Sequence, residues 1–342
     1  MSEDTELDAD PGVARDGSHG AVLLDGAMGT ELSRRGFSLE APLFSARALL
    51  DDPELIARVH FDYLLAGAQV LSTASFGLHA RTLAIAGMGE RQRELAARSV
   101  ELLEAVRAHG RAQDPSLAKF RVAGAISPLP GPRLPEEQRE LELAEYRALA
   151  EALIAAGADL ILLETFTDLV AASRALEALE DLGEVPVWLA VVAGAPPPAG
   201  SRRPDGSRLL AGEGFDALME LAGRGRGRRP EALLVNCTQI DAIPAALEAL
   251  VGAASRASWP GALGFYPHLG MRRVDGQWVE RIVDDEVFAE QMQAWQRRWP
   301  QLELLGACCG STPDYLAAMH RRFQPDAQTR ERAWTRLAEL VP

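Results

Sequence analysis

The sequence predicts an α/β protein that folds as a single-domain (β/α)8 TIM barrel. Short apolar runs alternate with longer amphipathic segments along nearly the whole chain. The apolar runs begin roughly 25 to 55 residues apart, which leaves room for one helix and two loops in each repeat. The length of 342 residues is one that such barrels reach as a single unit. A doubly wound open sheet is the alternative, but at this length it more often divides into two domains.

The predicted strands are nearly continuous in apolar residues, as expected of parallel strands that are buried on both faces. They lie at residues 21–26, 68–75, 120–127, 158–165, 185–192, 231–238, 261–268 and 302–310. Between them the apolar period becomes helical. The predicted helix faces are marked by Leu55, Val59 and Tyr63, by Tyr146, Leu149, Leu153 and Ile154, and by Phe215, Leu218, Met219 and Ala222.

Three segments lie outside this alternation. Residues 1–19 are acidic and polar, unlike a signal peptide, and we expect a disordered leader before a barrel domain at residues 20–342. Residues 194–206 form a Pro/Gly-rich loop after the fifth strand, on the side where barrels keep their active sites, and its role stays open. The basic run from Gly223 is interpreted as a solvated loop on the opposite rim, without a function.

The composition narrows the class of partner and the compartment. A formal net charge of −14 argues against binding to nucleic acid or to an anionic membrane. No apolar run approaches the ~18 residues of a membrane span. The chain has three cysteines, an odd number that does not make a disulfide framework, so we expect a reducing cytoplasm.

All three cysteines fall at predicted strand ends. Catalytic groups of this architecture come from the C-terminal ends of different strands, and Cys237 ends the sixth strand while Cys308 and Cys309 end the eighth. Three converging thiolates would repel one another unless a cation lies between them. Zinc suits sulfur ligands, and three protein ligands would leave one coordination position open for a substrate. For the adjacent pair there are two alternatives: the cysteines could pack in the core as small apolar side chains, or they could form a strained vicinal disulfide.

Other polar residues at the predicted strand ends have simpler explanations as well. Asp25 precedes a glycine and is also typical of a turn, and Glu164 could form a salt bridge in the barrel mouth. Asp168 is better explained as a helix N-cap than as a site residue. His268, at the end of the seventh strand, is expected to line the site without binding the metal.

Six segments resemble the homocysteine S-methyltransferases and occur in that family's order. They are "LLDGAMGTEL", "APLFSAR", "VHFDYLLAGAQVLSTASFG", "GADLILLETFTD", "LLVNCTQ" and "LLGACCGSTPDYL". The resemblance implies a zinc-dependent barrel that moves a methyl group to the sulfur of homocysteine and forms methionine. It also implies that Cys237, Cys308 and Cys309 bind Zn²⁺ and that Asp25 and Glu164 hold the amino group of homocysteine.

Further substrate contacts are expected from Gly26, Thr73, Ser75, Phe76 and Asn236. The hydroxyls of Thr73 and Ser75 could instead satisfy only backbone groups. We also expect backbone N–H groups around Gly26 and Ala27 to receive the carboxylate of homocysteine.

The identity of the methyl donor is less determined by the sequence. Many relatives carry "YPNSGE" after the seventh strand, whereas this chain has "YPHLGM" from Tyr266. The chain has no room for a corrinoid or folate domain, so we expect a small sulfonium donor, S-methylmethionine or S-adenosylmethionine. Betaine is the alternative, and its quaternary ammonium would call for an aromatic cage, to which Trp188, Phe166 and Tyr266 could contribute.

The predicted chemistry follows from the homocysteine thiol, whose unperturbed pKa is about 8.5. Zinc would deprotonate this thiol outright, so no general base would be required. Two hypotheses from other classes remain open: a non-catalytic barrel that stores zinc or senses thiols, and a metal-free lyase or aldolase-like barrel that uses Glu164 and Asp25.

Overall fold

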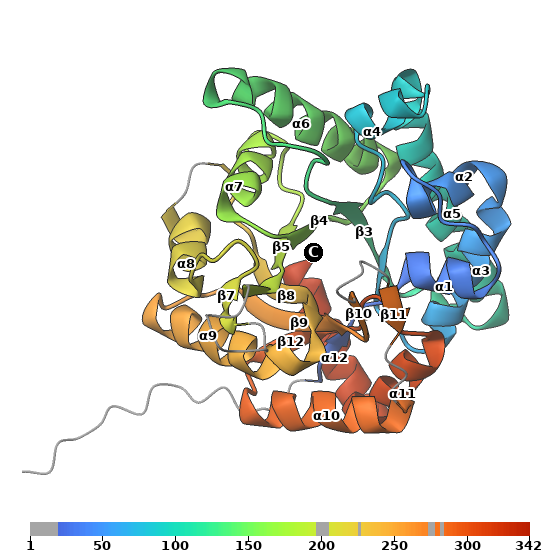
Figure 1. The fold of residues 1–342 in the computed structure, drawn as a ribbon. Coiled ribbons are helices and arrows are strands. Elements are labelled where there is room, and N and C mark those ends of the chain that lie inside the picture. Colours follow the sequence, from blue (N-terminus) through green and yellow to red (C-terminus); the bar gives the residue numbers. More distant parts are fainter. Residues whose placement is uncertain (1–19, 196–204, 225–226, 273–277, 281–283) are drawn as a thin grey trace, which may run out of the picture.

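The fold is a closed barrel of parallel strands surrounded by helices (Figure 1). The computed structural model describes residues 20–195, 205–224, 227–272, 278–280 and 284–342. Its main sheet has eight strands in the order β1-β12-β9-β8-β5-β4-β3-β2. The ring closes between β1 and β2, because Leu24 bridges Val70 in parallel and the N–H of Asp25 donates to the carbonyl of Val70 at 3.0 Å. The predicted (β/α)8 barrel is therefore confirmed.

Each predicted strand overlaps one strand of the barrel. The eight are β1 (Val22–Leu23), β2 (Val70–Ser72), β3 (Arg121–Ile126), β4 (Leu160–Phe166), β5 (Val187–Val191), β8 (Ala232–Gln239), β9 (Ala262–His268) and β12 (Leu302–Leu305). Two antiparallel hairpins that the sequence analysis did not predict follow β5 and β9. They pair β6 (Ala193–Ala195) with β7 (Asp205–Leu209) and β10 (Gly270–Arg272) with β11 (Trp278–Glu280). The predicted leader at residues 1–19 and most of the loop at 194–206 lie outside the described residues.

Helices form the outer layer of the barrel. They are α1 (Met28–Arg34), α2 (Ala48–Asp51), α3 (Pro53–Leu65), α4 (Ala80–Ile85), α5 (Gln92–Gln113), α6 (Arg139–Ala156), α7 (Leu169–Ala178), α8 (Phe215–Arg224), α9 (Ile243–Arg256), α10 (Asp285–Arg298), α11 (Pro313–Phe323) and α12 (Ala327–Leu340). The predicted apolar face of α3 is confirmed, since Leu55, Val59 and Tyr63 are all buried. Within the described part of the chain, no helix combines the length and the apolar character that a membrane crossing requires.

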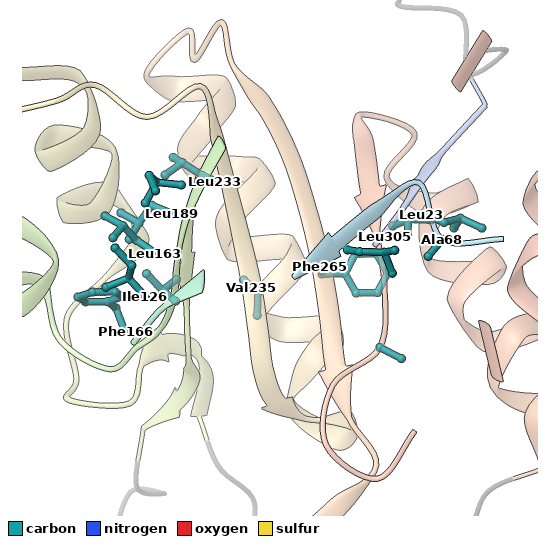
Figure 2. Close-up of a cluster of buried hydrophobic side chains, with 14 of the residues drawn as sticks. Leu23, Ala68, Ile126, Leu163, Phe166, Leu189, Leu233, Val235, Phe265 and Leu305 are labelled. Carbon is teal, nitrogen blue, oxygen red and sulfur yellow. The ribbon is translucent and has the colours of Figure 1, made fainter. Parts of the chain in front are cut away.

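Side chains alternate between the two faces of each barrel strand. Leu163, Leu189 and Leu233 are in register on β4, β5 and β8 and point outward, where helices cover them (Figure 2). Their neighbours Leu162 and Leu234 belong to a second cluster that fills the barrel interior. Because side chains close the interior, a ligand can enter the barrel only at a rim.

Helix α12 covers the N-terminal rim of the barrel. Its residues Leu337 and Leu340 join the interior cluster. Arg336 forms an ion pair with Glu303 at 2.8 Å, and the carbonyl of Val341 accepts a hydrogen bond from Arg121 at 2.7 Å. Glu303 and Arg121 stand near the beginnings of β12 and β3. The C-terminal ends of the strands consequently form the opposite rim, which is where the site lies.

Candidate active site

The three cysteines meet at the C-terminal rim. The sulfurs of Cys237, Cys308 and Cys309 all lie within 4.8 Å of one another, and Cys237 Sγ is 3.9 Å from Cys309 Sγ. All three are free thiols and half-buried. No other cluster of potential metal ligands occurs among the residues that the structure describes.

This spacing fits a tetrahedral metal ion. A zinc–sulfur bond of about 2.3 Å places two tetrahedral sulfur ligands about 3.8 Å apart. The distance between Cys237 Sγ and Cys309 Sγ is 3.9 Å, so these sulfurs need hardly move to share one ion. Thiolates are soft donors that suit zinc among the common divalent ions. The three residues therefore form a group that can hold a metal and leave a coordination position for a substrate sulfur.

Backbone contacts fix the loop that carries the adjacent cysteines. Strand β12 ends at Leu305, and the following turn lets both side chains face the site. The N–H of Cys308 donates to the carbonyl of Pro267 at 2.8 Å, and the carbonyl of Cys309 accepts from Leu269 at 2.7 Å. Gly310 has a φ of 89° and donates its N–H to the hydroxyl of Thr30 at 3.0 Å. The loop is thus tied to the end of β9 and to α1.

Charge is shared unequally among the three thiols. Hydrogen bonds from Cys237 and Cys308 hold the pKa of Cys309 well below its usual value. Hydrogen bonding to its two neighbours, with burial, raises the pKa of Cys308 well above its usual value. Cys309 is therefore the most acidic and Cys308 a less acidic member of the group. A divalent cation that binds all three sulfurs must displace the remaining thiol protons.

A cavity of about 280 Å³ opens beside the sulfurs. Five of the predicted site residues besides the cysteines line it: Asp25, Gly26, Thr73, Phe76 and Glu164. The cavity volume is at the lower end for small-molecule sites. The same rim therefore brings the three sulfurs and two carboxylates to one small compartment.

Asp25 is held by β2 as it faces this cavity. Its carboxylate accepts a hydrogen bond from the N–H of Ser72 at 2.8 Å and another from the hydroxyl of Ser72 at 3.0 Å. Burial raises the pKa of Asp25 to about 7, and these two hydrogen bonds offset part of that effect. Asp25 is thus oriented by Ser72, and among the described residues it forms no ion pair with a cationic side chain.

Glu164 lies at the end of β4, and its carboxylate accepts a hydrogen bond from the hydroxyl of Tyr266 at 3.4 Å. Burial, together with the nearby charges of Asp25 and Cys309, raises the pKa of Glu164 to about 8. A buried and a half-buried carboxylate that repel each other form a site that would favour a cation between them.

Two predicted substrate contacts use their side chains elsewhere. Ser75 is fully buried, does not line the cavity and donates its hydroxyl to the carbonyl of Ala125 at 2.6 Å. Thr73 lines the cavity, but its hydroxyl accepts from the N–H of Ala125 at 3.0 Å. Their hydroxyls therefore join β2 to β3, which is the backbone role that the sequence analysis left open.

Asn236 also does not line the cavity, although its partner Thr165 does. It is fully buried, and its side-chain oxygen accepts from the N–H of Thr165 at 3.1 Å. Its side-chain nitrogen donates to the hydroxyl of Thr165 at 2.9 Å. Asn236 thus bonds the end of β8 to the end of β4.

The expected carboxylate site around Gly26 and Ala27 stays a prediction: both residues line the cavity, but one of the expected N–H groups is already used. The N–H of Ala27 already donates to the hydroxyl of Ser311 at 3.2 Å. Gly26 is required for close packing, because a Cβ at this position would lie 2.6 Å from the ring of Tyr63 and 2.8 Å from the hydroxyl of Ser311. The segment that follows β1 is therefore packed against the cysteine loop.

The aromatic residues near the cavity differ from those proposed for a cage. Trp188 is fully buried in the barrel interior, and Phe166 is fully buried in the outer layer, so neither lines the cavity. Tyr266 lines it as expected. Phe44 and Phe76 also line the cavity and are 56% and 42% exposed, so they stand at its entrance.

His268 lies beside the three cysteines. Its Nδ1 is 4.0 Å from the sulfur of Cys237, and burial lowers its pKa. It therefore lies next to one of the three thiols but does not line the cavity, and its expected role at the wall of the site stays a prediction. Asp168 is an N-cap, as predicted, since its side chain accepts from the N–H groups of Val170 and Ala171 at the start of α7.

Sequence reasoning missed three features of the site: the hydrogen bonds from Ser72 to Asp25, the position of Phe44 at the entrance, and the two hydrogen bonds between Asn236 and Thr165. Phe44 belongs to the quoted segment "APLFSAR", but it begins a short 3-10 helix (Phe44–Arg47) that no periodicity marks. The described part of the basic run lies far from the cavity. Arg228 in this run precedes β8 and donates to the carbonyl of Val185 at 2.9 Å, so it stands near the opposite rim.

Fold and site together define a barrel enzyme with a three-cysteine group on its catalytic rim, and comparisons with known proteins agree. The family model described as homocysteine S-methyltransferase matches residues 22–323. The homocysteine S-methyltransferase of Escherichia coli is 32% identical over 313 residues, which cover 88% of this chain and 94% of that protein. The Bacillus subtilis homocysteine S-methyltransferase YbgG is 31% identical over 313 residues, covering 86% and 92%.

A solved structure gives the same result. The metallated form of the homocysteine methyltransferase MmuM from Escherichia coli superposes with a TM-score of 0.72 at 29% identity, covering 89% of this chain and 96% of that one. The chain belongs to the homocysteine S-methyltransferase family, and it is a methyltransferase.

Proposed function

We propose that this protein transfers a methyl group from a small sulfonium donor to the thiol of L-homocysteine, forming methionine, with Zn²⁺ held by Cys237, Cys308 and Cys309. The observation that carries the proposal is that these three sulfurs share one cavity with the carboxylates of Asp25 and Glu164. A thiol acceptor that also carries an ammonium group matches both sets of residues, with its thiol at the three sulfurs and its ammonium at the two carboxylates.

The three cysteines would bind the metal as thiolates. When bound, zinc would keep the homocysteine sulfur deprotonated at neutral pH. Three protein thiolates leave the centre with negative charge, which keeps the substrate sulfur electron-rich. His268 beside Cys237 and the backbone contacts of Cys308 and Cys309 hold the thiolates in place.

Asp25 and Glu164 would bind the ammonium group of homocysteine. The pKa values of about 7 and about 8 mean that a positive charge between the two would favour the ionised form of both. Charge-assisted hydrogen bonds from the ammonium would then offset the burial of the carboxylates. The hydroxyls of Ser72 and Tyr266 orient the two carboxylates before the substrate arrives.

The entrance residues Phe44 and Phe76 are suited to the donor. Aromatic faces attract cations, and a sulfonium is a cation whose positive charge disappears as the methyl group leaves. The volume of about 280 Å³ favours the smaller donor, S-methylmethionine, over S-adenosylmethionine. Betaine is the alternative donor, but neither Trp188 nor Phe166 is available to complete a cage around it.

The transfer itself is a displacement at carbon. The bond between the methyl carbon and the donor sulfur breaks with its electron pair remaining on the donor, which becomes a neutral thioether. The homocysteine sulfur forms the new bond, and its thiol proton has already passed to solvent. Alignment of the three atoms supplies much of the rate, so no general base takes part. The thiols must be reduced for this reaction, which is consistent with a cytoplasmic location.

The test supplies the zinc-loaded protein with homocysteine and one methyl-labelled donor at a time. We expect labelled methionine from S-methylmethionine or from S-adenosylmethionine. Glu164→Gln should raise KM for homocysteine, whereas the control Glu303→Gln, which removes a buried carboxylate at the opposite rim, should not. Methionine from betaine alone would overturn the donor assignment. Bound zinc without methionine from any donor would indicate a storage or sensing protein, and activity without metal would indicate a metal-free enzyme.

A further inference from the structure

The buried side chain of Asn236 connects two strand ends that each carry a residue of the active site. Its amide makes two hydrogen bonds to Thr165, one to the backbone N–H at 3.1 Å and one to the hydroxyl at 2.9 Å. Asn236 directly precedes Cys237 in β8, and Thr165 directly follows Glu164 in β4. The link therefore joins the side of the site that carries the metal ligand to the side that carries the carboxylate.

Both strands depart from regular geometry at this link. Thr165 has a φ of 65° and Cys237 a φ of 46°, which is left-handed backbone that residues other than glycine rarely adopt. The register between β4 and β5 shifts between Leu163 and Phe166, and that between β8 and β9 shifts between Asn236 and Gln239. Such conformations persist only when the surroundings fix them. The two hydrogen bonds of Asn236 are positioned to do so.

We propose that Asn236 is a positioning residue that locks Thr165 and Cys237 in these conformations, so that the Glu164 carboxylate and the Cys237 sulfur face the same cavity. The proposal rests on the proposed function, because it assigns these two groups to opposite ends of homocysteine. Asn236 does not touch the substrate in this arrangement. It sets the separation between the group that binds the ammonium and one of the sulfurs that bind the metal.

This separation matters because homocysteine is short. Its amino group and its sulfur are joined by a few single bonds, so both can be held at once only if their partners stand at the matching distance. Loss of the two hydrogen bonds between Asn236 and Thr165 should let the ends of β4 and β8 relax independently. Metal binding and homocysteine binding should then weaken together, although Asn236 contacts neither ligand.

The experiment uses the full chain and measures binding directly. Co²⁺ replaces zinc as the probe, because the absorbance of sulfur-to-cobalt charge transfer reports how many cysteines bind the ion. Asn236→Ala removes both hydrogen bonds, Thr165→Val removes the hydroxyl that accepts from Asn236, and Thr165→Ser keeps it. Gln324→Ala is the matched control, since its buried side-chain amide donates to the carbonyl of Ala21 at 2.7 Å, far from the cavity.

We expect Asn236→Ala to lower the affinity for Co²⁺ and for homocysteine by about tenfold or more, with weaker charge-transfer absorbance per ion. Thr165→Val should show a smaller loss of both, and Thr165→Ser should restore them. Gln324→Ala should lower the melting temperature without changing either affinity. If Asn236→Ala does not fold, the comparison of Thr165→Val with Thr165→Ser decides.

The proposal is overturned if Asn236→Ala or Thr165→Val loses thermal stability alone, as the control does, while both affinities stay at the wild-type value. It is also overturned if Thr165→Ser binds as weakly as Thr165→Val. Failure of the proposed function is distinguishable from these results. If the wild-type protein forms no methionine and does not bind homocysteine, the Co²⁺ spectra of the Asn236 and Thr165 variants still show whether their hydrogen bonds position the metal ligands.

Discussion

The sulfur of Cys237 lies 3.9 Å from the sulfur of Cys309, although strand β9 separates the strands that carry them. Cys237 reaches across β9 from a left-handed backbone position, and Cys309 reaches back from the turn after β12. Neighbouring thiols this close share protons when no metal is present.

Replacing Cys309 by serine should abolish tight metal binding. A hydroxyl is a poor ligand for zinc beside two thiolates, and the remaining pair cannot complete the group. We expect the affinity for zinc to fall by at least about 100-fold, and methyl transfer to fall with it. Elemental analysis after dialysis against a chelator measures the first effect. Full metal content in a folded Cys309→Ser protein would contradict the assignment of this ligand.

Metal binding should release protons. Hydrogen bonds from its neighbours keep Cys309 ionised, whereas Cys308 holds its proton because its pKa is well above the usual value. We expect about two protons to leave per zinc ion at neutral pH, so the affinity should rise as the pH rises. Calorimetry in buffers of different ionisation enthalpy counts these protons. An affinity that does not change with pH would show that the thiols are already ionised.

Asp25→Asn should change how the stability of the substrate-free protein depends on pH. The pKa of Asp25 is about 7 in the folded chain, above the ordinary value of 3.8. The folded state therefore holds this proton between those two pH values, while the unfolded state has lost it. The free energy of unfolding should accordingly fall as the pH rises from about 4 to about 7, by up to about 1.4 kcal/mol per pH unit.

The asparagine variant should lack this contribution, since its amide can keep both contacts with Ser72 without a charge. Denaturant unfolding at a series of pH values compares the two proteins. At the same time KM for homocysteine should rise, because one partner of the ammonium is lost. An unchanged pH profile together with an unchanged KM would show that Asp25 is neither strained by burial nor used for binding.

Phe44→Ala should weaken the methyl donor selectively. Phe44 is 56% exposed and stands at the cavity entrance, where we place the donor. A cation–π contact contributes about 0.5 to 2 kcal/mol, so KM for a sulfonium donor should rise by roughly 2- to 30-fold. KM for homocysteine should stay the same, and Phe44→Trp should retain donor affinity. Steady-state kinetics with each substrate varied in turn separates the two effects.

Much of the architecture could be predicted because buried parallel strands leave a strong signal. The run that contains Leu160, Leu162 and Leu163 is apolar on both faces, and this alone indicates a strand covered by helices outside and by packed side chains inside. The convergence of the cysteines followed from the same pattern, since the strand ends of a barrel share a rim. The structure brings their sulfurs together as expected.

The side-chain directions at the strand ends could not be predicted. Alternation assigns faces only while a strand stays regular, and β8 becomes irregular at Asn236 and Cys237. The register with β9 shifts only after Asn236, so the residues that follow it, beginning with Cys237, lose the regular alternation. The sequence also does not show that the amide of Asn236 bonds to Thr165. Trp188 was misplaced for another reason: its run is apolar on both faces, and the sequence does not show whether a ring fills the interior or reaches the rim.

The seam between β1 and β12 determines when this site can exist during folding. Val22 and Leu23 pair with Leu304 and Leu305, so β1 can pair with β12 only after nearly the whole chain has been synthesised. Contacts between such distant segments form slowly. Cys308 and Cys309 follow shortly after β12. Because they come together with Cys237 only when β12 has joined the barrel, metal binding should report that the barrel has closed.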